Sequence, residues 1–209
     1  VEKSHLKTML SLEAERMGSL KLLDEELQKE RQVVIEERRM RTEDNPNARL
    51  YERFNALAYD ANPYRRPVIG WQSDIEGYQI ADLQNWYDRW YAPNNATLVV
   101  VGDVTPEEVK RIAQETLGQV PARAHDGKHK IPQVLPVGEK RLTMHDERAK
   151  VPMLMMGYAV PSLLTAEDKA DAYALAVLAE VLDGGSSAGF SKELVRGQLL
   201  VSEGGGEGE

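Results

Sequence analysis

Apolar side chains recur at helical spacing along most of the first 120 residues. In the first stretch they stand at Leu6, Met9, Leu10, Leu12, Met17 and Leu20, with charged residues between them. This periodicity predicts an amphipathic helix with one buried face. The same reasoning predicts helices over residues 24–41, 47–59, 73–90, 105–118, 166–182 and 190–200.

Residues that start and stop helices support these boundaries. Thr105 followed by Pro106 is a typical start, because threonine caps a helix and proline suits its first turn. Ser73 and Glu76 fit a capping box. Asp44-Asn45-Pro46 predicts a stop, since the residue before proline is disfavoured in the helical conformation. The aromatic residues near the end of the 73–90 helix are expected in the core rather than on a substrate-binding surface: Trp86, Tyr87, Trp90 and Tyr91.

Three short segments have the composition of strands instead. Residues 97–101 are rich in β-branched side chains, residues 140–146 alternate weakly, and residues 153–160 form a continuous apolar run. Helices mixed with such strands predict an α+β fold, with antiparallel sheets flanked by helices. Proline, glycine and charged residues make 121–138 the expected linker between a part at 1–120 and a part at 139–203, and the glycine-rich tail 204–209 is expected to be disordered.

Composition excludes several kinds of function. The formal net charge is −8, whereas a nucleic-acid binder needs clustered basic residues. Arg38, Arg39 and Arg41 are interleaved with acidic residues and predict a solvated helix face. The chain has no cysteine, so disulfides and thiolate metal sites are ruled out. No apolar run approaches the ~20 residues that cross a bilayer. Because the chain opens at Val1 in what reads as a helix, we expect it to be a fragment.

The candidate chemistry lies in the predicted helix 24–41. Glu30 and Glu37 are seven residues apart, which places both carboxylates on one helix face about 10.5 Å apart along the axis. On the residues alone, Glu37 reads as a solvated carboxylate paired with Arg38 or Arg41, and Glu30 as an exposed pair partner. His125 and His129 have the spacing of a metal-binding pair, but they fall in the linker beside Gly127, which disfavours a helix. We expect no physiological metal there, and none at His5 or His145.

Five segments, in order along the chain, together resemble the pitrilysin-like family of zinc metallopeptidases, which includes insulysin and the mitochondrial processing peptidase. They are Leu12–Met17, Glu30–Glu37, Pro67–Gly70, Trp90–Val104, and Leu182–Ser187 followed by Leu194–Arg196. The resemblance covers nearly the whole chain. It implies that residues 1–120 are the C-terminal part of the first, metal-site repeat and that residues 139–203 are the N-terminal part of the second.

The resemblance also implies roles for the two carboxylates. Glu37 matches the glutamate that ligates zinc in this family, and Glu30 matches a carboxylate that supports catalysis from behind the metal. The family takes its other two ligands and its general base from a His-x-x-Glu-His helix, which this sequence does not contain. Pro67–Gly70 resembles the family's substrate-side loop.

Two functions follow from the resemblance. The chain is expected to be part of a zinc-dependent metalloendopeptidase that cleaves peptides or unfolded segments, inactive as a fragment and without bound zinc. The alternative is a non-catalytic relative that acts as a structural or substrate-holding subunit; a His-x-x-Glu-His motif encoded ahead of Val1 would favour the enzyme. Expected partners are a peptide substrate, a second family half in the same chain or in another subunit, and further copies of the chain. Family analogy favours a bacterial periplasm or cytoplasm.

Overall fold

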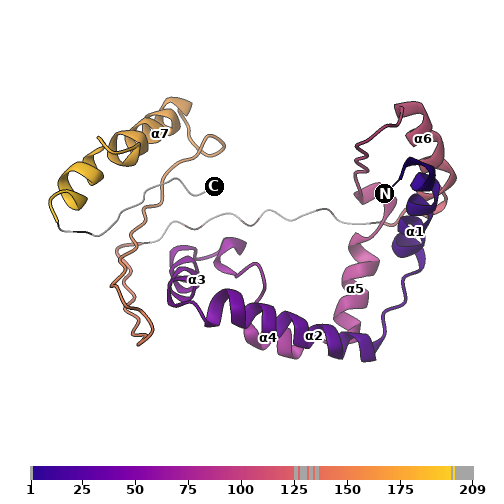
Figure 1. The fold of residues 1–209 in the computed structure, drawn as a ribbon, viewed down its shortest axis with the longest axis horizontal. Coiled ribbons are helices and arrows are strands. Elements are labelled where there is room, and N and C mark those ends of the chain that lie inside the picture. Colours follow the sequence, from indigo (N-terminus) through magenta and orange to yellow (C-terminus); the bar gives the residue numbers. More distant parts are fainter. Residues whose placement is uncertain are drawn as a thin grey trace. The chain divides into compact units, whose positions relative to one another are not determined.

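The computed structural model describes residues 2–124, 127, 131, 134, 137–198 and 200. The chain divides after Met155 into two units. The first unit contains helices α1 to α6, and the second contains α7 (Figure 1). The predicted boundaries at 120, 138 and 203 stay predictions, and the predicted tail 204–209 lies outside the described residues.

Six α-helices occur among the described residues of the first unit. They are α1 (Leu6–Ser19), α2 (Asp24–Arg38), α3 (Pro46–Ala58), α4 (Gln72–Gly77), α5 (Ile80–Trp90) and α6 (Pro106–Glu115). Short 3-10 turns occur at Lys3–His5, Pro63–Arg65, Pro93–Asn95 and Leu117–Gln119, and a π-helical turn, η2, covers Arg39–Glu43. The helices predicted at 24–41, 47–59 and 105–118 are confirmed to within a few residues.

A cap read from the sequence accounts for the start of α6, and a cap that was not predicted divides another helix in two. Thr105 accepts a hydrogen bond from the Glu108 backbone N–H at 3.2 Å, as predicted for α6. The single helix predicted from Ser73 to Trp90 is wrong. The chain leaves the helical conformation at Tyr78, and α5 starts afresh with a capping box formed by Gln79 and Asp82.

The predicted α+β fold is also wrong, because no strand occurs in the part of the chain that the structure describes. Residues 97–101 and 153–160 run without regular hydrogen-bonded structure. Val99 is 77% exposed and Tyr158 is 85% exposed. A strand exists only when a second segment satisfies its backbone groups. Composition revealed that these segments suit a sheet, but it could not supply the partner.

Helix packing in the first unit centres on a few buried apolar side chains. The α1 and α6 helices pack together, and α2 lies beside α4 (Figure 1). Ile75 of α4 is fully buried, and Leu27 of α2 is 7% exposed. The hydroxyl of Tyr87 in α5 donates to the Arg16 carbonyl at 2.9 Å and accepts from the Leu20 backbone N–H at 3.2 Å. These two bonds tie α5 to the end of α1.

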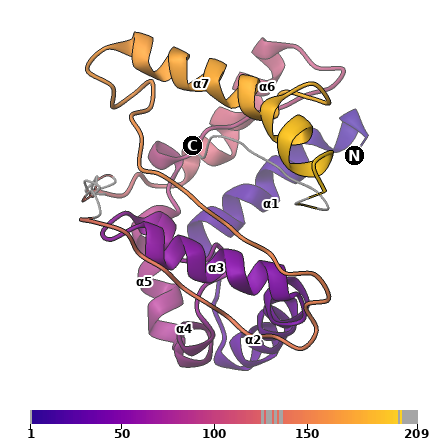
Figure 2. The same ribbon diagram turned by 90° about the vertical axis from the view of Figure 1, so that its left-hand side faces the viewer.

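An extended segment, residues 139–150, runs past α3 in the same unit (Figure 2). We call it the strap. Near one end, the Lys140 ammonium donates to the Leu57 carbonyl at 3.1 Å. Near the other, Asp146 pairs with Arg49 of α3 at 2.8 Å, and Arg148 donates to the Glu43 carbonyl at 2.8 Å. Polar contacts therefore hold both ends of the strap against α3 and its entry turn.

The second unit contains α7 (Lys169–Asp183) and a π-helical turn at Ser191–Val195. Asp168 caps α7 by accepting from the Ala170 backbone N–H at 2.9 Å. The predicted helix at 166–182 is confirmed, whereas the one predicted at 190–200 is reduced to the π turn. In the described part of the chain, no helix combines the length and the apolar character needed to cross a bilayer.

Candidate functional site

The helix α2 carries both candidate carboxylates. Asp24, Glu25 and Glu26 occupy its first turn, where negative charge is favourable because the helix dipole is positive at that end. One side of α2 faces α4 and buries Leu27. Another side stays open to solvent. Its exposed apolar residues are Val33, which is 58% exposed, and Met40 of the following turn, which is 59% exposed.

Glu37 lies on this open side. Together with Gln32, Val33, Glu36 and Met40 it lines a shallow hollow. Its side chain is 38% exposed, and one carboxylate oxygen pairs with Arg41 at 2.7 Å. Of the two partners that the sequence offered, Arg38 and Arg41, the structure selects Arg41. The carboxylate does not face a sheet among the described residues, so its geometry alone is that of a half-exposed helix residue between two apolar neighbours.

The described residues do not assemble a complete metal site. Glu30 is exposed and does not belong to the set that lines the hollow. No three His, Asp or Glu side chains within the described ranges come close enough to hold a metal ion together. His5 and His145 are both exposed, and the pair His125 and His129 lies outside the described residues. Among the described residues, Glu37 and its neighbour Glu36 line the hollow without a third metal-binding side chain near them.

Arg38 is the residue that sequence reasoning missed. The sequence placed it on a solvated face with Arg39 and Arg41, but it is 2% exposed. Its guanidinium donates to both oxygens of Glu52 in α3, at 2.8 and 3.0 Å. The hydrogen bonds that Arg38 donates to Glu52 raise the pKa of Arg38 above its ordinary value. The prediction failed because charge interleaving does not reveal which of three arginines points inward.

Arg39 and Arg41 do behave as the sequence predicted. Arg39 is half-exposed and pairs with Glu36 at 2.5 Å and with Asp44 at 2.8 Å. Its hydrogen bond lowers the pKa of Glu36. Glu36 of the first pair lines the hollow, and the apolar lining residues Val33 and Met40 stay exposed beside it.

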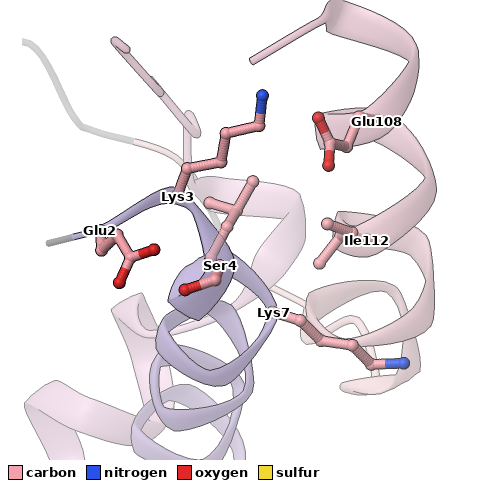
Figure 3. Close-up of a pocket in the computed structure, with 7 residues that line it drawn as sticks. Glu2, Lys3, Ser4, Lys7, Glu108 and Ile112 are labelled. Carbon is pink, nitrogen blue, oxygen red and sulfur yellow. The ribbon is translucent and has the colours of Figure 1, made fainter. Parts of the chain in front are cut away.

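A second shallow hollow lies between the start of the chain and α6. Its walls are Glu2, Lys3, Ser4, Leu6 and Lys7 on one side and Glu108 and Ile112 on the other (Figure 3). Lys7 of α1 pairs with Glu115 of α6 at 2.8 Å, an exposed contact between the two helices. None of the residues that the sequence singled out as candidates is in this hollow.

The aromatic group of α5 is only partly in the core. Tyr87 is 6% exposed, but Trp86 is 63% exposed. The guanidiniums of Arg16 and Arg123 stack over the rings of Tyr91 and Tyr87, with centroid distances of 5.8 and 5.0 Å. The prediction of a core position is thus right for Tyr87 and wrong for Trp86.

Comparison with known proteins gives these features a family. Residues 78–206 match the family described as the peptidase M16 inactive domain. The chain belongs to peptidase family M16. The pitrilysin-like resemblance drawn from the five segments is therefore confirmed. Glu37 and α2 precede the matched residues, so the part of this M16 chain that carries the candidate carboxylate is not the part described as inactive.

Named relatives extend the likeness to α2. The zinc protease PqqE of Helicobacter pylori is 33% identical over 203 residues, which are 96% of this chain and 45% of PqqE. The crystal structure of a protease from Helicobacter pylori has a TM-score of 0.62 at 29% identity, covering 95% of this chain and 48% of that one. A mutant of the ferredoxin protease FusC, solved in complex with Arabidopsis ferredoxin, has a TM-score of 0.54 at 30% identity, covering 61% of this chain and 14% of FusC. The chain thus spans less than half the length of these relatives.

Proposed function

We propose that this chain is part of a zinc-dependent metalloendopeptidase that cleaves peptides or unfolded segments. The observation that carries the proposal is the match to a zinc protease over 96% of the chain, which includes α2. In the proposal Glu37 is one zinc ligand and Glu30 acts from behind the metal. The apolar neighbours of Glu37 on the open side of α2 support this, because an open face of that kind suits contact with a further part of the protein.

The number of metal ligands near Glu37 limits what this chain can do by itself. A catalytic zinc site has three protein ligands and an open position for water, whereas the described residues bring no three such ligands together at this place. The other two ligands would be histidines from residues outside this chain. Zinc bound there would supply Lewis-acid activation of water. The chain by itself is expected to bind no zinc and to hydrolyse no peptide.

The test replaces Glu37 by glutamine in the complete protein. Glutamine keeps the size of the side chain but is a poor zinc ligand, so Glu37→Gln should remove zinc and peptidase activity together. Glu25→Gln is the matched control, because Glu25 lies on the same helix and also pairs with a cation four residues on, Lys29, at 2.9 Å. Elemental analysis reports the metal, and cleavage of a casein-like substrate reports the activity. Zinc content in Glu37→Gln equal to that of the wild type would overturn the proposal.

The alternative function is a non-catalytic M16 subunit that holds substrate or supports structure. It is favoured by the match of residues 78–206 to a domain described as inactive, and by the Glu37–Arg41 pair, which needs no metal. Elemental analysis of the wild-type complete protein separates the two functions. One zinc per chain favours the peptidase, and a metal-free protein with no His-x-x-Glu-His motif favours the subunit.

The proposal also covers partners. We expect a second family half, in the same chain or in another subunit, to cover apolar residues that the described chain leaves exposed. Val99 and Val101 are 77% and 93% exposed, which also supports self-association of this chain when it is made alone. Light scattering after size exclusion would test this, and a strictly monomeric chain across a wide concentration range would contradict it.

A further inference from the structure

Arg38 connects three separate segments through one buried guanidinium. It lies at the end of α2 and makes a two-pronged ion pair with Glu52 of α3. It also donates to the Gly70 carbonyl at 2.9 Å and to the Glu43 carboxylate at 3.1 Å. The side chain of Glu52 is 7% exposed and that of Arg38 is 3% exposed. The pair is therefore shielded from water and from salt.

The contact with Gly70 extends this connection to the loop Pro67–Gly70. The loop closes with a hydrogen bond from the Gly70 N–H to the Pro67 carbonyl at 2.9 Å. Gly70 has φ +91°, a conformation that side chains other than glycine rarely adopt. Val68 at the tip of the loop is completely exposed. Arg38 thus fixes the base of a turn whose apolar tip has no cover within the described first unit.

Stability alone is a weak reason for such an arrangement. A buried ion pair contributes little net stability, because desolvation of the two charges offsets their attraction, and apolar residues of similar volume often do as well. Within the described part of the chain, the Nε of Arg38 is buried with no hydrogen-bond partner. The pair instead fixes the orientation of the Arg38 side chain, because a planar guanidinium pairs with a carboxylate in only a narrow range of geometries.

The orientation of Arg38 also determines the side of α2 on which Glu37 lies. Successive residues of a helix are about 100° apart around its axis, so a fixed inward position of Arg38 places Glu37 on the open flank. Val33 and Met40 lie four residues before and three residues after Glu37, on the same flank. A helix side chain reaches about 5–6 Å from the axis, so a rotation of about 20° would move the carboxylate about 2 Å. Metal–ligand distances tolerate only about 0.2 Å.

We propose that Arg38 is a positioning residue, which holds the Glu37 carboxylate and the loop Pro67–Gly70 in one fixed relation through its contacts with Glu52 and Gly70. The inference rests on the proposed function, since it gives Arg38 a role toward the metal ligand Glu37. Arg38 itself touches neither metal nor substrate. Its loss should loosen metal binding and change how substrate is held, while the fold is retained.

Two variants of the complete protein test this. Arg38→Lys keeps the positive charge opposite Glu52 but loses the fork. The double variant R38M/E52Q removes both charges, so that no buried charge is left unpaired. Arg39→Gln is the control, because Arg39 is the adjacent arginine and its pairs with Glu36 and Asp44 are exposed. Circular dichroism confirms folding, and the rate of zinc loss to a chelator is measured beside kcat and KM.

We expect Arg38→Lys and R38M/E52Q to lose zinc 10–100-fold more readily than the wild type, the range typical when a group behind a metal ligand is removed. We also expect faster amide hydrogen exchange in the loop Pro67–Gly70 and an increase in KM, with Arg39→Gln unchanged in all three. Wild-type zinc retention and loop exchange in both Arg38 variants would overturn this inference alone, provided that Glu37→Gln loses zinc. Retention of zinc in Glu37→Gln would instead overturn the proposed function, and this inference with it.

Discussion

Replacing Glu52 by glutamine should destabilise the joint between α2 and α3 far more than loss of an exposed ion pair does. The side chains of Glu52 and Arg38 are 7% and 3% exposed, and both oxygens of Glu52 accept from the guanidinium. Removing one partner of a buried pair costs about 3–5 kcal/mol, because the other charge stays buried without compensation. Glutamine keeps one acceptor, and the Gly70 carbonyl and Glu43 remain. We therefore expect a cost of about 2–3 kcal/mol, since a hydrogen bond to a charged group contributes about 1.5–3 kcal/mol.

Hydrogen exchange measures this cost where it arises. The opening free energies of amides in α2 and α3 should fall by the full amount in Glu52→Gln, whereas those of α6 should change little. Glu25→Gln is the control, because the exposed Lys29–Glu25 pair should contribute only about 0.3–0.5 kcal/mol. If Glu52→Gln lowered protection by less than about 1 kcal/mol, the pair would not be acting as a buried one. The account of Arg38 as an anchor would then lose its basis.

Two further predictions concern the strap and the end of α1. Hydrogen bonds from Arg148 and Arg49 lower the pKa of Asp146, so its contacts should persist from neutral pH down through the range where free carboxyl groups titrate, and fail only in stronger acid. Asp146→Asn should release the strap at every pH and make limited proteolysis by trypsin within residues 139–150 faster. Glu139→Gln, in the same segment, should leave the cleavage rate unchanged. Equal cleavage rates in the two variants would contradict this prediction. Tyr87→Phe leaves the Leu20 N–H without its partner and should lower the free energy of unfolding by about 1–3 kcal/mol. Urea denaturation measures this change, and an unchanged midpoint would show that water replaces the hydroxyl.

The sequence predicted best those features whose cause is local. Thr105 with Pro106 carries a complete signal for a helix start within a few residues, and α6 begins there. Asp44-Asn45-Pro46 predicted a helix stop, and the helical run through α2 and its π turn ends at Glu43. A helix does start near Ser73, but the single helix expected through Trp90 was wrong, because Gln79 and Asp82 form a second cap six residues later. Local signals decided each case, and the error arose where two such signals competed.

Features that depend on distant segments could not be predicted in the same way. Residues 97–101 carry strand composition, yet a sheet needs a partner that the composition does not name. Arg38 and Glu52 are fourteen positions apart on two helices, and their pairing depends on the angle of the turn between them. The candidate role of Glu37 came from resemblance to a family, since its half-exposed setting in α2 would not by itself distinguish it from Glu36.

The π-helical turn Arg39–Glu43 sets the angle between α2 and α3. In it the Asp44 N–H bonds to the Arg39 carbonyl, five residues back, at 2.9 Å. Deleting one residue here would restore an ordinary helical turn, but it would swing everything after it by about 100° around the axis and take Glu52 away from Arg38. Natural length variation among related chains should therefore avoid these five positions. Gaps in alignments should fall beyond Ala58 instead, and any homologue shortened within the turn should also lack the arginine–glutamate pair.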